Sequence, residues 1–132
     1  MDTIWNSNYK SRQGNIGLGQ AIAYYTYLGI PVSIPLNDTQ KYDLIVDKNN
    51  ELFRVSVKTT QYKENSGNYA VQLKNSGGGS KGSTIRSFDN TTCDIIFVYT
   101  KDGDMYEIPS NCITAKSSIV LNDNIYGKYK VN

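Results

Sequence analysis

Two adjacent β-strand patterns place the strongest constraint on how this chain can fold. Residues 42–46 (YDLIV) are rich in β-branched and aromatic side chains, and residues 52–59 alternate between apolar and polar ones. The polar residues 48–50 between them predict a tight hairpin turn. In such a hairpin, residues whose numbers sum to about 99 lie opposite each other, so we expect Asp43 beside Ser56 and close to Lys58.

The alternation in the second strand also predicts its orientation. One face holds the apolar residues Phe53, Val55 and Val57. The other face holds the polar residues Arg54, Ser56 and Lys58. This pattern is typical of a strand with one face on a core and the other in solvent. We therefore expect the polar stripe to face away from the core.

The remaining patterns complete an α/β domain. Asn15 can cap a helix whose apolar residues recur at helical spacing, and Gly29 is placed to end it. Residues 94–99 have the content of a central strand, and residues 105–108 form a second hairpin with them. A short helix over residues 110–113 and a polar tail from residue 117 follow. Helix and strands in this order favour a mixed sheet with flanking helices.

A run of glycine and serine at residues 75–83 is the one low-complexity segment. It interrupts the patterns rather than separating two sets of them, so we expect a flexible loop within a single domain of residues 1–132. The chain of 132 residues has an ordinary length for one domain. The run lacks the spacing of a nucleotide-binding P-loop.

The absence of histidine excludes several kinds of chemistry. Catalytic sites that use an imidazole base, and zinc sites with histidine ligands, cannot be built from this chain. Cys93 and Cys112 are nineteen positions apart without a C-x-x-C motif, so we expect two free, buried thiols rather than a zinc or redox site. No run is apolar enough to span a membrane, and the N-terminus does not resemble a signal peptide. A cytoplasmic protein with no membrane contact is the expectation.

The charge is small overall but uneven along the sequence. The net charge is +2, whereas residues 54–86 carry six basic residues and one acidic residue. Such a segment indicates either a surface that faces nucleic-acid phosphates or scattered, solvated lysines. Under the first interpretation, the expected phosphate contacts are Arg54, Lys63, Lys74, Lys81 and Arg86.

The predicted neighbours Asp43 and Lys58 also allow two interpretations. A carboxylate, a main-chain carbonyl and a lysine can together hold a hard divalent cation such as Mg²⁺ and polarise a water molecule. The same two side chains can instead form an ordinary cross-strand ion pair, which contributes little to stability. Spacing alone does not choose between a metal site and this ion pair.

A longer series of motifs resembles the PD-(D/E)xK nucleases, and in particular their group I intron-encoded homing endonucleases. The resemblance rests on residues 14–17 (GNIG), 34–36 (IPL), 42–46 (YDLIV), 54–59 (RVSVKT), 93–99 (CDIIFVY) and 106–109 (YEIP). These motifs run in order through nearly the whole chain. The resemblance implies a restriction-endonuclease-like α/β core, with a mixed central β-sheet and flanking helices.

Site residues follow from the same resemblance. It implies that Asp43 and the carbonyl of Val57 bind Mg²⁺, with Mn²⁺ as a substitute, and that Lys58 orients or deprotonates the attacking water. Two positions depart from the family pattern. Ser56 stands where the family has Glu, Asp or Gln, and Leu18 stands where the first helix often carries a glutamate. Ser56 could reach a metal only through water, and leucine cannot bind one.

Three functions remain open on these grounds. The first is a Mg²⁺-dependent DNA endonuclease of the homing type. The second is a Holliday-junction resolvase of the same fold, and the third is a degenerate relative that binds DNA or another protein without cutting. Cutting both strands of a duplex needs two sites, so we expect a homodimer or larger symmetric assembly on double-stranded or branched DNA.

Overall fold

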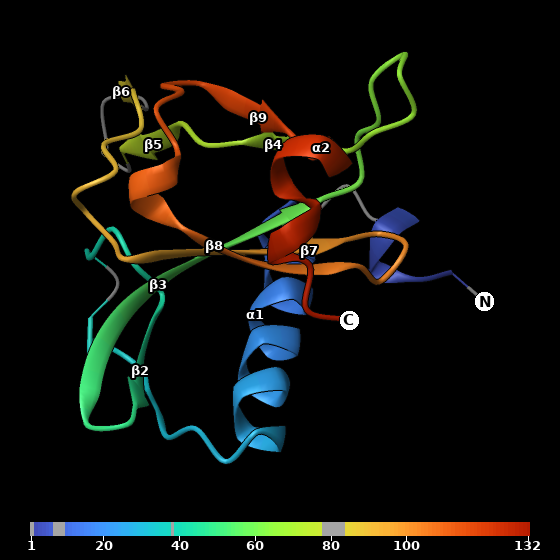
Figure 1. Cartoon of the computed structure of the whole chain (residues 1–132). Coiled ribbons are helices and arrows are strands. Elements are labelled where there is room, and N and C mark those ends of the chain that lie inside the picture. The colour runs from blue at the N-terminus through green and yellow to red at the C-terminus, as the bar shows by residue number, and fades with distance from the viewer. Residues whose placement is uncertain (1, 7–9, 38, 78–83) are drawn as a thin grey trace.

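The computed structural model describes residues 2–6, 10–37, 39–77 and 84–132. Its centre is a mixed five-stranded sheet with the strand order β1-β2-β3-β7-β8 (Figure 1). These strands are β1 (Val32–Ser33), β2 (Leu44–Lys48), β3 (Glu51–Thr60), β7 (Ile95–Thr100) and β8 (Met105–Pro109). The central pair β3 and β7 is parallel, and the other neighbouring pairs are antiparallel. This mixed sheet is the α/β core that the sequence predicts.

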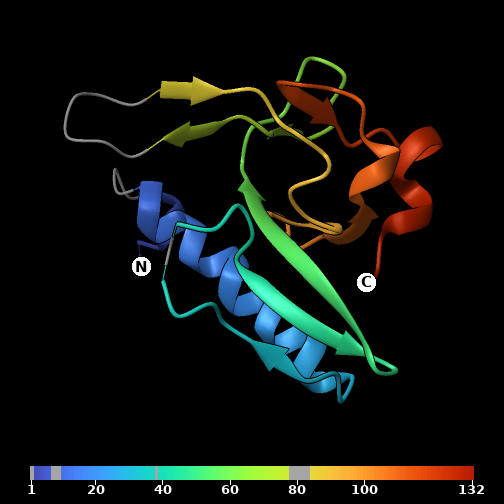
Figure 2. The ribbon, with the colours of Figure 1, turned by 90° about the vertical axis from the view of Figure 1, so that its left-hand side faces the viewer.

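The other elements lie on the two faces of the sheet or, in the case of one small ribbon, project beyond it. They are η1 (Ile4–Asn6), α1 (Lys10–Tyr27), β4 (Ala70–Gln72), β5 (Asn75–Gly77), β6 (Thr84–Arg86), η2 (Ser110–Cys112), β9 (Ser118–Val120), α2 (Asp123–Tyr126) and η3 (Gly127–Tyr129). Two small antiparallel sheets pair β4 with β9 and β5 with β6. Helix α1 lies on one side of β2 and β3, and the β4–β9 pair with α2 lies on the other (Figure 2).

The hairpin of β2 and β3 has the predicted register. Leu44 pairs with Val55 and Ile45 with Arg54, so the sums of paired numbers agree with the expectation. The turn residues Asn49 and Asn50 have φ angles of 55° and 69°. Asparagine tolerates this left-handed region better than other residues with a side chain, and two such residues in succession form the turn that suits a twisted hairpin.

Helix α1 begins earlier than predicted and ends where predicted. It starts at Lys10, so Asn15 lies inside the helix and the prediction that it caps the N-terminus is wrong. Gly14, Gly17 and Gly19 in the first half of α1 lower its intrinsic helix propensity. Contacts between the helix and the sheet stabilise it despite this. At the other end, Gly29 has a φ of +73°, and the N–H of Ile30 donates to the carbonyl of Tyr25 at 2.9 Å. This is the pattern of a glycine C-cap.

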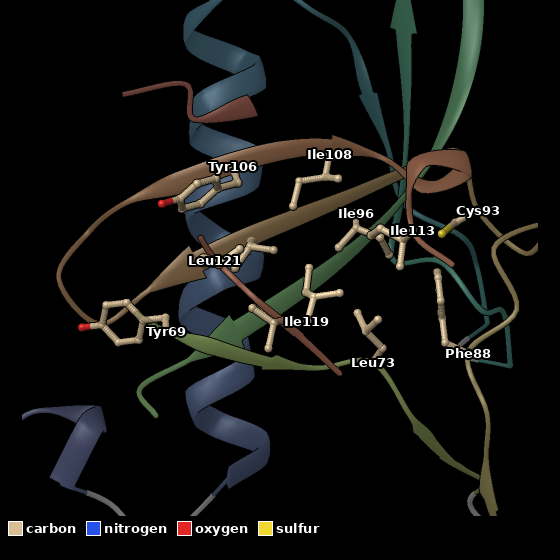
Figure 3. Packing of buried hydrophobic residues seen from close by; sticks show 12 residues of the cluster. Tyr69, Leu73, Phe88, Cys93, Ile96, Tyr106, Ile108, Ile113, Ile119 and Leu121 are labelled. Atoms are coloured by element: carbon tan, nitrogen blue, oxygen red, sulfur yellow. The ribbon is translucent and has the colours of Figure 1, made fainter. Parts of the chain in front are cut away.

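Both faces of the central sheet are buried, which corrects one sequence-based expectation. Val55 belongs to a core beneath α1, whereas Ile96 and Val98 belong to a second core on the opposite face. Figure 3 shows this second core, with Ile96 packed near Ile113. Ser56 and Lys58 pair with Ile96 and Val98 across the parallel strands, so their side chains share that second face. Ser56 is only 6% exposed. The polar stripe of β3 therefore faces a covering layer and not open solvent.

Three further expectations need correction or limits. The tail is not merely polar, because β9, α2 and η3 lie in it, and Ile119 and Leu121 are buried in the second core. The glycine and serine run starts as strand β5, while residues 78–83 lie outside the described residues. Of the two free thiols, Cys93 is buried as predicted but Cys112 is exposed. Among the described helices, none is both long and apolar enough to span a bilayer.

Candidate active site

The carboxylate of Asp43 is held in place by the backbone of β3. Asp43 directly precedes β2, and its N–H donates to the carbonyl of Val55 at 2.8 Å. Its Oδ2 accepts the N–H of Val57 at 2.7 Å. These two bonds extend the β2–β3 pairing past its last ladder pair. They fix the carboxylate beside Val57, one position along the strand from Ser56, the residue expected opposite Asp43.

The carbonyl of Val57 lies on the same side of β3 as Asp43. The carbonyls of Arg54 and Thr60 accept bonds of 2.8 Å and 2.9 Å from Asp94 and Lys101, the residues that flank β7. Even-numbered residues of β3 therefore direct their backbone polar groups to β7, and odd-numbered residues direct theirs to β2. Because β2 does not extend beyond Leu44, the Val57 carbonyl faces the side of β3 on which the Asp43 carboxylate lies.

Lys58 lies partly buried next to this pair of oxygens. Burial lowers the pKa of its ammonium group, and the nearby Asp43 carboxylate opposes this shift by raising it. A lysine with a lowered pKa is a better proton acceptor near neutral pH than an exposed one. On the same face, burial raises the pKa of the Cys93 thiol to about 11, so this cysteine stays protonated.

The site has few acidic side chains that could bind a metal ion. Within the described ranges, no group of three Asp, Glu, Cys or His side chains could enclose a metal ion. Position 18, where the nucleases that the sequence resembles often carry a metal-binding glutamate, holds a leucine. Its side chain is partly buried against the core beneath α1. One carboxylate and one carbonyl still fit Mg²⁺, which is commonly bound through one or two carboxylates, with waters and substrate phosphates filling the other positions.

A cavity of about 220 Å³ adjoins Val57 and Lys58. Its lining comes from η1, the first turns of α1 and the end of β3, namely Trp5, Lys10, Gln13, Gly14, Val57, Lys58, Thr59, Gln61 and Tyr62. Most of these residues were not predicted as part of the site. Gln13 could have been found from the sequence in one way. It lies one turn before Gly17, the glycine at which α1 approaches β3, and therefore on the same face of the helix.

Gln13 connects the walls of this cavity. Its side chain is buried, and its Nε2 donates to the carbonyls of Ile4 and Trp5 at 3.2 Å and 3.4 Å. Its Oε1 accepts a bond of 3.3 Å from Nε2 of Gln61. The helix α1, the short helix η1 and the segment after β3 are thus tied together by one side chain.

The predicted phosphate contacts fall in different places. Lys74 and Arg86 are exposed at the base of the β5–β6 ribbon, which projects at the end of the molecule where α1 begins (Figure 2). Lys63 is exposed and pairs with Asp102 at 3.2 Å. Arg54 is bound by Asp94 at 3.2 Å and by the carbonyl of Thr91 at 3.0 Å. Lys81 lies outside the described residues.

A larger cavity of about 620 Å³ lies against the first half of β3. Its cations are neutralised locally, because Lys48 pairs with Glu107 at 2.7 Å and Arg54 pairs with Asp94. This balanced lining differs from that of the smaller cavity beside Lys58, whose lining includes no Asp or Glu side chain.

The mixed five-stranded sheet with α1 packed on it has the α/β fold of the PD-(D/E)XK endonucleases. The family model described as PD-(D/E)XK endonuclease matches residues 8–128, and the chain belongs to this family. The chain is also similar to a solved structure of a bacterial homing endonuclease, I-Ssp6803I. The match has a TM-score of 0.74 and 26% sequence identity, and covers 88% of this chain and 79% of the other. No curated protein sequence matches the chain.

Proposed function

We propose that this protein is a Mg²⁺-dependent DNA endonuclease of the homing type. The observation that carries the proposal is the 2.7 Å bond from the Val57 N–H to Asp43, which fixes a carboxylate beside a strand carbonyl. Membership of the PD-(D/E)XK family supports a divalent metal, because nucleases of this family generally use one. The similarity to a homing endonuclease supports duplex DNA as the substrate.

Each site residue has a distinct role in this proposal. Asp43 and the Val57 carbonyl would hold the divalent metal, which would supply Lewis-acid activation of a water molecule. Lys58 orients this water and accepts its proton, which its lowered pKa favours. The Ser56 hydroxyl assists through a bound water, because serine is shorter than the carboxylate or amide side chains of the family pattern.

The remaining parts of the proposal concern how DNA is held. We propose that residues 1–132 act as one nuclease domain, with phosphate contacts from Lys74, Lys81 and Arg86. Arg54 and Lys63 join these contacts by exchanging their carboxylate partners Asp94 and Asp102 for DNA phosphates. Two copies in a symmetric homodimer would supply the two sites that a double-strand cut requires. Light scattering coupled to size-exclusion chromatography tests this assembly. A mass of one chain, both free and with a duplex bound, would contradict it.

A cleavage assay tests the activity without knowledge of the target sequence. Supercoiled plasmid is incubated with the protein and Mn²⁺, which relaxes the demand for a specific site, and nicked and linear products are counted. We expect cleavage by the wild type, and a loss of at least about 100-fold in Asp43→Asn and Lys58→Met, since general acid–base groups alone contribute this much. Asp47→Asn, a second aspartate on the same hairpin, is the matched control and should remain active.

Two further measurements separate the proposal from its alternatives. Crystals soaked in Mn²⁺ should show an anomalous peak between Asp43 and the Val57 carbonyl, and Asp43→Ala should abolish it. A wild type that binds duplex DNA but neither cuts it nor shows this peak would be a noncatalytic relative. A wild type that cuts a four-way junction and leaves linear duplex and supercoiled DNA intact would be a resolvase.

A further inference from the structure

We propose that the cavity beside Val57 and Lys58 binds a phosphate of the DNA backbone, and that Lys10 and Tyr62 are its ligands. This inference rests on the proposed function of the neighbouring site. It adds two residues to the expected DNA contacts, and both lie outside the set that the basic segment of the sequence indicates.

Lys10 and Tyr62 form one hydrogen-bonding unit. Lys10 is the first residue of α1, and Tyr62 follows the end of β3. The Lys10 Nζ donates to the Tyr62 hydroxyl at 2.9 Å and lies 5.3 Å from the centroid of its ring. An ammonium group has three N–H donors, and a tyrosine hydroxyl that accepts one bond can still donate its own proton. The pair therefore retains N–H and O–H donors beyond their mutual hydrogen bond, and donors are what an anion requires.

The charge of the cavity favours the same ligand. No Asp or Glu side chain lines it. Among the described residues, Lys10 takes part in no ion pair, whereas Lys48 and Arg54 in the larger cavity are each paired with a carboxylate. No carboxylate in the described part of the chain therefore neutralises the Lys10 charge. Tyr62 is 63% exposed, so a DNA strand can reach the pair from solvent.

The cavity lies next to the proposed catalytic residues, and hydrogen bonds hold its walls in position. Val57 and Lys58 line it together with Lys10 and Tyr62, so the cavity adjoins the residues proposed to carry the reaction. The Tyr62 carbonyl accepts the N–H of Ala70 at 2.8 Å, and Gln13 ties α1 to Gln61. A ligand site fixed in advance in this way loses less free energy to ordering when DNA binds.

Binding to DNA without cleavage tests the inference. The affinity of the full chain for a fluorescein-labelled 20-base-pair duplex of arbitrary sequence is measured in EDTA at several salt concentrations. Each phosphate contact adds about 0.9 to the slope of log K against log salt. We expect Lys10→Met to lower the slope by about this amount for each chain bound, and Lys10→Arg to restore it. Tyr62→Phe should weaken binding several-fold while keeping most of the slope.

Lys128→Met is the matched control for this experiment. Lys128 also lies over a tyrosine ring, at 5.2 Å from the centroid of Tyr129, but it belongs to η3, beside the edge strand β8. Its loss should leave the slope unchanged. Circular dichroism and the melting temperature confirm that each variant is folded.

The outcomes distinguish this inference from the proposed function. If the wild type does not bind the duplex in a salt-dependent way, the proposed function itself fails. If the wild type binds and Lys10→Met keeps the wild-type slope, only the phosphate site is overturned. In a second arm, inorganic phosphate at constant ionic strength is titrated by calorimetry. Phosphate binding that requires Lys10, without any change in the duplex slope, would indicate a small-anion site and would overturn the assignment to DNA.

Discussion

Val57 donates its backbone N–H to the carboxylate of Asp43 at 2.7 Å, and this bond joins the two halves of the candidate active site. The donor belongs to the main chain, so the carboxylate is oriented without the help of another side chain. The same residue supplies the carbonyl that faces the side of β3 on which this carboxylate lies. Two oxygens of the site are thus positioned by the β-hairpin itself.

Gly17 allows α1 to approach β3, which gives a test of the packing that supports the site. A Cβ at this position would overlap Oγ1 of Thr59, whereas a Cβ at Gly19 would meet nothing within 4 Å. We expect Gly17→Ala to lower the free energy of unfolding by about 1–3 kcal/mol, the usual cost of overpacking. Gly19→Ala should raise it by about 0.5–1 kcal/mol, because alanine favours the helix. Urea titration measures both, and equal effects would refute the close approach.

Tyr25 and Glu107 connect α1 to β8 through the core. The fully buried Tyr25 donates its hydroxyl to Glu107 Oε2 at 2.5 Å, and Lys48 binds Oε1 at 2.7 Å. Tyr25→Phe should cost about 1–2 kcal/mol of stability, because a partly buried carboxylate loses a donor. Tyr27→Phe is the control, since Tyr27 is 89% exposed in the same helix and its substitution should change the urea midpoint little. Indistinguishable midpoints for the two variants would contradict this account.

Asp94 should make the fold sensitive to acid. Hydrogen bonds from the Arg54 side chain lower the pKa of Asp94 below its ordinary value of 3.8. A carboxyl group whose pKa is lower in the folded state stabilises the protein above the unfolded pKa, and this stabilisation is lost as the pH falls through the folded pKa. In urea titrations between pH 7 and pH 2, Asp94→Asn should therefore lose less stability than the wild type. Parallel losses in the two proteins would count against a contribution from this pair.

The two thiols should differ in reactivity. Cys93 is buried in the second core, and burial raises its pKa to about 11, whereas Cys112 is exposed. Because the thiolate is the reactive form, a disulfide reagent such as DTNB should modify one thiol in the native protein and two in denaturant. Cys112→Ser should leave no rapidly reacting thiol under native conditions. Rapid reaction of that variant would show that Cys93 is accessible.

Part of the candidate site could be predicted because it is local. Asp43 and Val57 belong to one hairpin, and its register follows from two alternating patterns and a two-asparagine turn. The cavity beside them could not be predicted in this way. Lys10 and Tyr62 are 52 positions apart, and no periodic pattern relates them. Their meeting depends on how α1 packs against the sheet.

The sequence by itself determined the hairpin, the helix end at Gly29, the central strand β7 and the residue types available for chemistry. These features depend on side-chain alternation, backbone preferences and composition, all of which act over a few residues. The tertiary structure decided that the polar face of β3 is covered, that α1 begins at Lys10, and that the tail supplies part of the second core. Each of these depends on contacts between distant segments, and the free energy of such contacts outweighs local preference.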